Sequence, residues 1–116
     1  MVLAFAWSST ADPGSTRPGD YDVLVNATPV GMIPDPPDRL PFVEGVIRTA
    51  RLVVESVGNP SRTSFVGIAR DAGLSVIEGS DITLTQAVEQ FWLYTGVRLR
   101  VDQVGRAAAY ARAVLA

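Results

Sequence analysis

The segment Val23-Leu24-Val25-Asn26-Ala27-Thr28-Pro29-Val30-Gly31-Met32 decides the fold. Its first three residues form a continuous apolar run, which is typical of a strand buried on both faces of a parallel sheet. The run ends in the polar Asn26-Ala27-Thr28 and turns through Pro29 and Gly31. Backbone amides and a short amide side chain therefore lie at the carboxyl end of the strand. Open α/β sheets bind cofactors at this edge.

The rest of the chain alternates strand and helix patterns. We expect strands over 21–25, 51–57 and 74–78, a strand or frayed start over 1–7, and a loop of turn-forming residues over 8–20. Helices are expected over 42–50, 63–72 and 103–115, and residues 79–81 are expected to lead into a long helix that ends near 96. Strands and helices joined by short connections predict an α/β fold with a parallel sheet flanked by helices. So few strands make only half of a doubly wound domain and leave one apolar face of the sheet uncovered.

The helices carry recognisable end signals. Gly73 is expected to cap the helix over 63–72. Thr83 and Gln86 have the spacing of a capping box for the long helix, and Asp102 can cap the last one. The long helix is apolar around much of its circumference, so it needs partners on more than one side.

Composition narrows the function classes. The 116 residues are 47% hydrophobic, which suits one domain or part of one. Their net charge of −2 argues against binding to nucleic acid, which requires a basic surface. The chain has no cysteine, which fits a cytoplasmic protein, and no apolar run of about 18 residues that could span a membrane. Every basic residue is arginine, so only Asp, Glu or Tyr could transfer a proton near neutral pH.

Several motifs in order resemble one enzyme family. They are the segment from Asp22 to Met32, Asn59-Pro60-x-x-Thr63, the glycines at 73 and 79, and Gln86-Ala87-x-x-Gln90-Phe91-x-x-x-Thr95-Gly96. Over roughly 21–96, the chain resembles the carboxy-terminal portion of the shikimate and quinate dehydrogenase family.

The resemblance implies a fold, an activity and a cofactor. After the N-terminal strand and loop at 1–20, it places the second half of a Rossmann-like nucleotide-binding domain at 21–79 and C-terminal helices at 80–116 that would pack on a substrate domain. Family members are cytoplasmic oxidoreductases of aromatic amino acid biosynthesis, on the route to chorismate. They use NADP or NAD to interconvert 3-dehydroshikimate and shikimate.

The resemblance also implies site residues. Asn26, Thr28, Met32, Ser56 and Gly79 match cofactor contacts; Gln86 matches the side chain that binds a substrate hydroxyl; and Gly58 stands where the family has a tyrosine that contacts the substrate carboxylate. The absence of a Cβ at Gly79 would let a nicotinamide ring approach its backbone, and Gln86, expected in the first helical turn, can donate and accept at once.

Simpler interpretations of three of these residues stay open. Gly79 could serve only a strand-to-helix turn, Gln86 only a capping box, and Asn26 only the end of its strand. The sequence also departs from the family at Glu55, where an aspartate is usual, and at Ile82-Thr83, where Met-Leu is usual.

The family's catalytic lysine and aspartate, its serine-rich substrate loop and its glycine-rich phosphate loop have no counterpart in these 116 residues. We therefore expect no catalytic residue and no metal ligand here, and no dehydrogenase activity from the chain alone; it would be a part or a split subunit that works with a separate N-terminal half. One alternative is a non-catalytic module in which the helix over 84–94 pairs with another copy. Another is a small-molecule binder or an enzyme that uses Glu55 and Asp81 as paired carboxylates, although the helix dipole explains Asp81 better.

Overall fold

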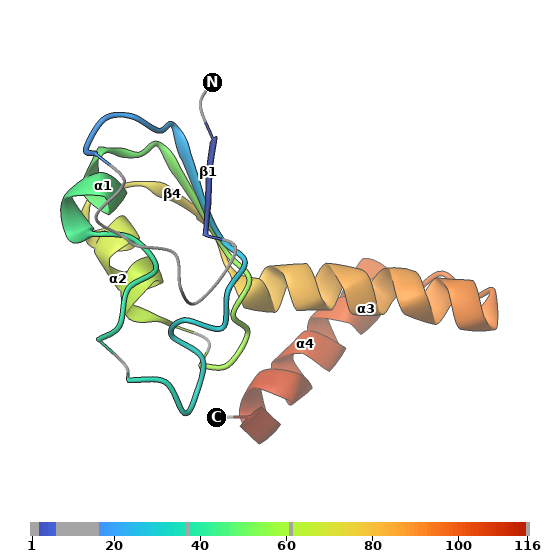
Figure 1. The fold of residues 1–116 in the computed structure, drawn as a ribbon. Coiled ribbons are helices and arrows are strands. Elements are labelled where there is room, and N and C mark those ends of the chain that lie inside the picture. Colours follow the sequence, from blue (N-terminus) through green and yellow to red (C-terminus); the bar gives the residue numbers. More distant parts are fainter. Residues whose placement is uncertain (1–2, 7–16, 37, 61, 116) are drawn as a thin grey trace. The chain divides into compact units, whose positions relative to one another are not determined.

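Four parallel strands form a single sheet. The computed structural model describes residues 3–6, 17–36, 38–60 and 62–115. The strands are β1 (Leu3–Ala6), β2 (Val23–Asn26), β3 (Leu52–Glu55) and β4 (Ser75–Ile77), and they lie side by side in that order (Figure 1). The three strands predicted outright are confirmed with shorter bounds, and the segment 1–7, predicted as a strand or a frayed start, contains strand β1. Most of the loop predicted over 8–20 lies outside the described residues.

Two helices cover one face of this sheet. They are α1 (Glu44–Thr49) and α2 (Ser64–Asp71), which follow β2 and β3 in the chain (Figure 1). The core between helices and sheet consists of fully or nearly buried apolar side chains: Leu24, Phe42, Val46, Ile47, Ala50, Val53, Phe65 and Ala69. The aromatic rings of Phe42 and Phe65 are 5.8 Å apart, centroid to centroid.

The opposite face of the sheet is less covered. Val25 and Val54 are half-buried there, and Ile77 is 42% exposed. The prediction of a fully buried strand holds for most of β2, where three of the four residues are buried, but not for β3, along which burial alternates as the pleat of a strand with one covered face requires. The sequence of β3 hid this alternation because apolar residues stand on both of its faces.

Helix α2 begins and ends as predicted. The Thr63 hydroxyl accepts a hydrogen bond from the backbone N–H of Val66 (3.3 Å), which caps the first turn. At the other end Gly73 adopts a φ of +76°, a left-handed conformation that ends the helix cheaply only at glycine.

The remaining helices are α3 (Gly79–Thr95) and α4 (Val101–Leu115). Residues from Thr83 onward form a compact unit separate from Met1–Ile82, so the first residues of α3 belong with the sheet and the rest with α4. Gly96, with a φ of +71°, ends α3.

Both predicted caps in this region are wrong. Helix α3 begins at Gly79, so Thr83 lies inside it and cannot be its N-cap; Asp81 supplies the first-turn acid instead. In α4, Asp102 lies within the first turn, and Gln103 accepts the hydrogen bond from the backbone N–H of Arg100 (2.9 Å). A glutamine three residues after the N-cap is half of a capping box.

Candidate functional site

Asn26, the last residue of β2, anchors a buried polar cluster. Its side-chain amide donates to the carbonyl of Val30 (3.0 Å) and to Oε1 of Glu55 (2.9 Å), and its Oδ1 accepts from the backbone N–H and the hydroxyl of Thr28 (3.1 and 2.6 Å). The Thr28 hydroxyl in turn accepts from the N–H of Val30 (3.1 Å). These bonds fold the segment after β2 into a fixed loop at the carboxyl edge of the sheet.

Glu55, the last residue of β3, is the second anchor. Asn26 and Glu55 are register partners on neighbouring strands, which puts both side chains on the same face. Oε1 of Glu55 also accepts from the N–H of Val57 (3.0 Å), and Oε2 accepts from the Thr63 hydroxyl (2.8 Å). Glu55 is only 1% exposed.

The acidity of Glu55 reflects this burial. Loss of water around the carboxylate raises the pKa of Glu55, and the hydrogen bonds from Val57, Thr63 and Asn26 oppose that rise without cancelling it. No buried side-chain polar atom lacks a partner among the described residues. The cluster is therefore a satisfied network that holds the backbone in place.

Next to this cluster, the loop after β2 turns outward. The N–H of Gly31 donates to Asp35 (3.1 Å), and Asp35 pairs with Arg39 (2.9 Å); the bond from Gly31 is the main reason that the pKa of Asp35 lies below its usual range. A shallow hollow of about 240 Å³ opens here, lined by Pro29, Val30, Met32, Pro34, Asp35 and Arg39. Met32 is 43% exposed at its rim.

Ser56 and Gly79, the predicted cofactor residues that follow β3 and β4, lie at the same carboxyl edge of the sheet as Asn26 and Glu55. Ser56 is exposed, and its hydroxyl and N–H donate to the carbonyl of Asn26 (2.6 and 3.1 Å). Gly79 is buried against the backbone after β3: a Cβ added there would lie 2.2 Å from the carbonyl oxygen of Val57 and 2.9 Å from the nitrogen of Gly58. The missing side chain of Gly79 thus serves a close contact between two backbone segments of the protein.

The two predicted substrate residues are placed differently. Gly58 is exposed beside the Gly79 contact. Gln86 lies in the third turn of α3, not the first, because the helix begins at Gly79. Gln86 is exposed and belongs to the unit that starts at Thr83.

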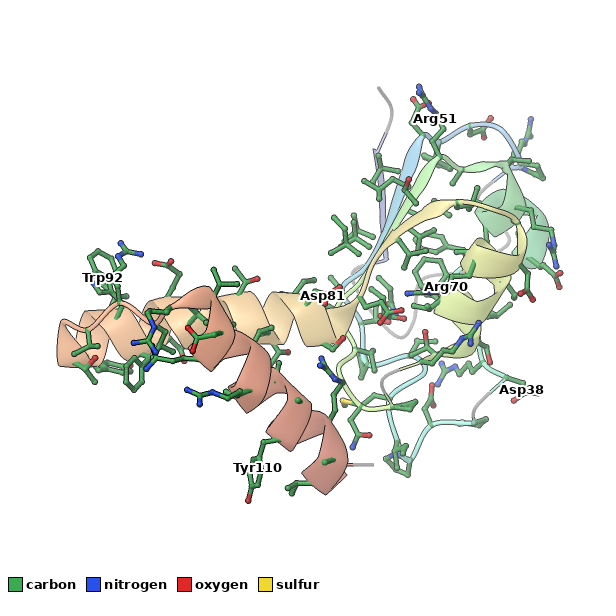
Figure 2. All side chains as sticks on the ribbon, turned by 180° about the vertical axis from the view of Figure 1, so that it is seen from behind. Asp38, Arg51, Arg70, Asp81, Trp92 and Tyr110 are labelled. Carbon is green, nitrogen blue, oxygen red and sulfur yellow. The ribbon has the colours of Figure 1, made fainter. Side chains whose placement is uncertain are left out.

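Glu55 and Asp81, the possible carboxylate pair, lie in surroundings that differ from each other. Glu55 is enclosed by its three donors, whereas Asp81 is exposed in the first turn of α3, where Figure 2 shows it at the start of the long helix. A buried, fully hydrogen-bonded Glu55 is a structural group and not a proton donor open to a substrate. Within the described ranges no cluster of His, Cys, Asp or Glu could hold a metal ion, and no helix is long and apolar enough to cross a membrane.

Comparison with known proteins agrees with this arrangement of elements. No protein-family model matches the chain. A shikimate dehydrogenase (NADP(+)) from Prosthecochloris aestuarii is 35% identical over 89 residues, which make up 73% of this chain and 31% of that protein. The chain is homologous to part of the shikimate dehydrogenases. The matched part is the carboxy-terminal portion of these relatives.

Solved structures of shikimate dehydrogenase relatives share the fold. A shikimate 5-dehydrogenase-like protein has a TM-score of 0.72 and 38% identity over 78% of this chain and 34% of its own. Quinate dehydrogenase from Corynebacterium glutamicum in complex with NAD has a TM-score of 0.66 and 30% identity over 78% of this chain and 31% of its own. The chain thus spans about a third of the length of the relatives that it matches.

The sequence did not reveal the roles of Glu55 and Thr63. Glu55 stood out only as a departure from the family and as a candidate carboxylate, and Thr63 only as a motif position, whereas in the structure Glu55 bonds to both Asn26 and Thr63. One signal was available: Asn26 and Glu55 each end a predicted strand, and parallel strands bring such residues to one edge.

Proposed function

We propose that these residues form the nicotinamide-side half of the cofactor domain of an NADP-dependent oxidoreductase that acts on shikimate or a similar ring acid. The observation that carries the proposal is the network that joins Asn26, Glu55 and Ser56 at the carboxyl edge of a parallel sheet. Homology to shikimate dehydrogenases over this region supports it. The expected location is the cytoplasm.

In this proposal the buried residues hold the loop in place, and the exposed residues contact the cofactor. Asn26 and Thr28 use their side chains for internal bonds, so they would act by holding the loop. Met32, Ser56 and the backbone at Gly58 are exposed at the edge and fit one end of a dinucleotide. The bound cofactor would accept or supply the hydride. Gln86, which offers both a donor and an acceptor, would bind a substrate hydroxyl.

We further propose that these 116 residues do not catalyse the reaction alone. They contain neither lysine nor histidine, and the buried Glu55 is held by internal hydrogen bonds. A hydride transfer to or from a ring hydroxyl also requires a group that exchanges a proton with that oxygen. That group would come from the part of the relatives that these residues do not span.

A chimera tests this proposal directly. The matched carboxy-terminal region of the Prosthecochloris relative would be replaced by the corresponding residues of this chain, and NADP+ reduction with shikimate would be followed at 340 nm. We expect measurable activity, and a lower KM for shikimate after Gly58→Tyr, which returns the family's tyrosine. A chimera that unfolds cooperatively, binds NADP+ and yet shows no turnover would contradict the proposal.

A second candidate is the non-catalytic module that pairs with another copy. The unit from Thr83 onward favours it, because large apolar side chains are well exposed there: Leu93 (70%), Tyr94 (86%), Val101 (91%), Tyr110 (72%) and Val114 (61%). Figure 2 shows Tyr110 directed away from its helix. Where such groups form one contiguous patch, the patch is typical of an interaction surface. Sedimentation equilibrium decides the point: a dimer that Tyr94→Ser with Tyr110→Ser converts to monomer would support pairing, and a wild-type monomer would exclude it.

A further inference from the structure

Glu55 contacts, directly or through one neighbour, each of the segments that make up the candidate site. Its Oε1 accepts from Asn26 at the end of β2 and from the N–H of Val57 in the loop after β3. Its Oε2 accepts from Thr63, the N-cap of α2. One side chain therefore links two loops and the start of a helix.

The bond to Val57 extends this link to α3. The N–H of Val57 is fixed by Glu55, and the carbonyl oxygen of Val57 lies against Gly79, the first residue of α3. The N–H and the carbonyl of Val57 belong to adjacent peptide units joined at the Val57 Cα, so a backbone change that freed the N–H would also shift the carbonyl packed against Gly79. The position of α3's first turn thus depends on the same carboxylate.

The bond to Asn26 extends the link in the other direction. Asn26 uses one amide group to hold both Glu55 and the carbonyl of Val30, and its Oδ1 holds Thr28. A backbone bond from Ile33 to the carbonyl of Asn59 (3.4 Å) joins the same two loops farther out. Loss of Glu55 would leave the Asn26 amide and the Val57 N–H buried with one acceptor fewer, and an unpaired buried group is costly.

We propose that Glu55 is the positioning residue of this site: it holds the loop 27–33, the segment 56–58 and the start of α3 in the one arrangement that presents them to a cofactor. This inference deepens the proposed function, since the cofactor is the one proposed above. Glu55 itself does not touch the ligand. It acts through Asn26 and Val57.

Amide hydrogen exchange of the full chain without ligand tests the positioning. In Glu55→Ala we expect the amides of Thr28, Val30 and Val57 to exchange at least about tenfold faster, the loss expected for one buried hydrogen bond. Val53 and Val54 in β3 should keep their rates. Glu55→Gln keeps one oxygen for Asn26 and Val57 and should restore slow exchange to within about threefold.

Two further variants keep the test decisive. Thr63→Val removes only the bond to Oε2 and the cap of α2, so Val66 should exchange faster while Thr28 and Val57 stay slow. If Glu55→Ala does not fold, Glu55→Asp, which withdraws the carboxylate by one methylene, should show the same faster exchange at Val57. Unchanged exchange at Thr28, Val30 and Val57 in the alanine or the aspartate variant would overturn the proposal.

A titration with NADP+ then tests whether Glu55 matters for cofactor binding and not only for the stability of the fold. In the wild type and in Glu55→Gln, we expect NADP+ to shift the amide resonances of Met32, Ser56 and Gly79; in folded Glu55→Ala these shifts should be lost. A wild type whose resonances do not shift with NADP+ would refute the proposed function. The hydrogen-exchange experiment would still decide the role of Glu55. Ligand shifts of equal size in Glu55→Ala would overturn the role of Glu55 alone.

Discussion

Replacing Gly79 by alanine should strongly destabilise the unit that contains the sheet. The added Cβ would lie 2.2 Å from the carbonyl oxygen of Val57, about 1 Å short of an ordinary contact. The obstructing atoms are backbone, and that backbone is tied to Glu55 through the N–H of Val57 (3.0 Å), so it cannot move aside cheaply. Overpacking of this kind costs about 1–3 kcal/mol, and we expect about 3 kcal/mol here.

The matched control is Gly67→Ala in α2. Nothing lies within 4 Å of a Cβ added at Gly67, so alanine there should stabilise the helix by about 0.5–1 kcal/mol. The assay is urea unfolding followed by circular dichroism. With a slope of about 1 kcal/mol per M, Gly79→Ala should lower the midpoint by roughly 3 M, and Gly67→Ala should raise it slightly. A Gly79→Ala protein as stable as the Gly67→Ala protein would refute the close contact with Val57.

Three further changes test the core and the cluster. Phe65→Ala should cost about 3–5 kcal/mol in urea unfolding because the ring is 1% exposed and packs on Phe42; a loss below about 1 kcal/mol would contradict that packing. Thr63→Val should cost about 2 kcal/mol, since it removes both the cap of α2 and a donor to Glu55; a neutral result in the same assay would show that neither bond matters. Glu55→Gln should alter the pH dependence of stability. Burial raises the pKa of Glu55 in the folded protein above its ordinary value of 4.5. Between these two pKa values the folded protein keeps a proton that the unfolded chain has lost, so wild-type stability falls as the pH rises from 4.5 through the raised pKa. The urea midpoint of the variant should therefore gain on the wild type across this range, and a constant difference would argue against a raised pKa.

The sequence predicts the elements well where a local signal marks their ends. Gly73 and Gly96 both adopt positive φ and end α2 and α3 where the pattern places those ends. The start of α3 was misjudged because Thr83 and Gln86 imitate a capping box inside the helix; the helix begins four residues earlier, at the contact with Val57.

The candidate site is less predictable because it depends on contacts between strands. Asn26 and Glu55 are 29 residues apart in the chain, and only the parallel register makes them partners. The sequence pattern identified Asn26 as important, but it could not show that its side chain is directed inward to a carboxylate. The close contact of Gly79 could not be predicted for the same reason, since the segment that packs against it belongs to another loop.

The most direct test of the central claim is a titration of the uniformly 15N-labelled chain with NADP+, followed by two-dimensional NMR. We expect concentration-dependent shifts that are largest at Met32, Ser56, Gly58 and Gly79, the exposed or edge positions around the cluster of Asn26 and Glu55. Amides in α4 should not respond. A spectrum that stays unchanged at millimolar NADP+, or one whose shifts fall only outside this edge of the sheet, would contradict the claim that these residues form the nicotinamide side of a cofactor site.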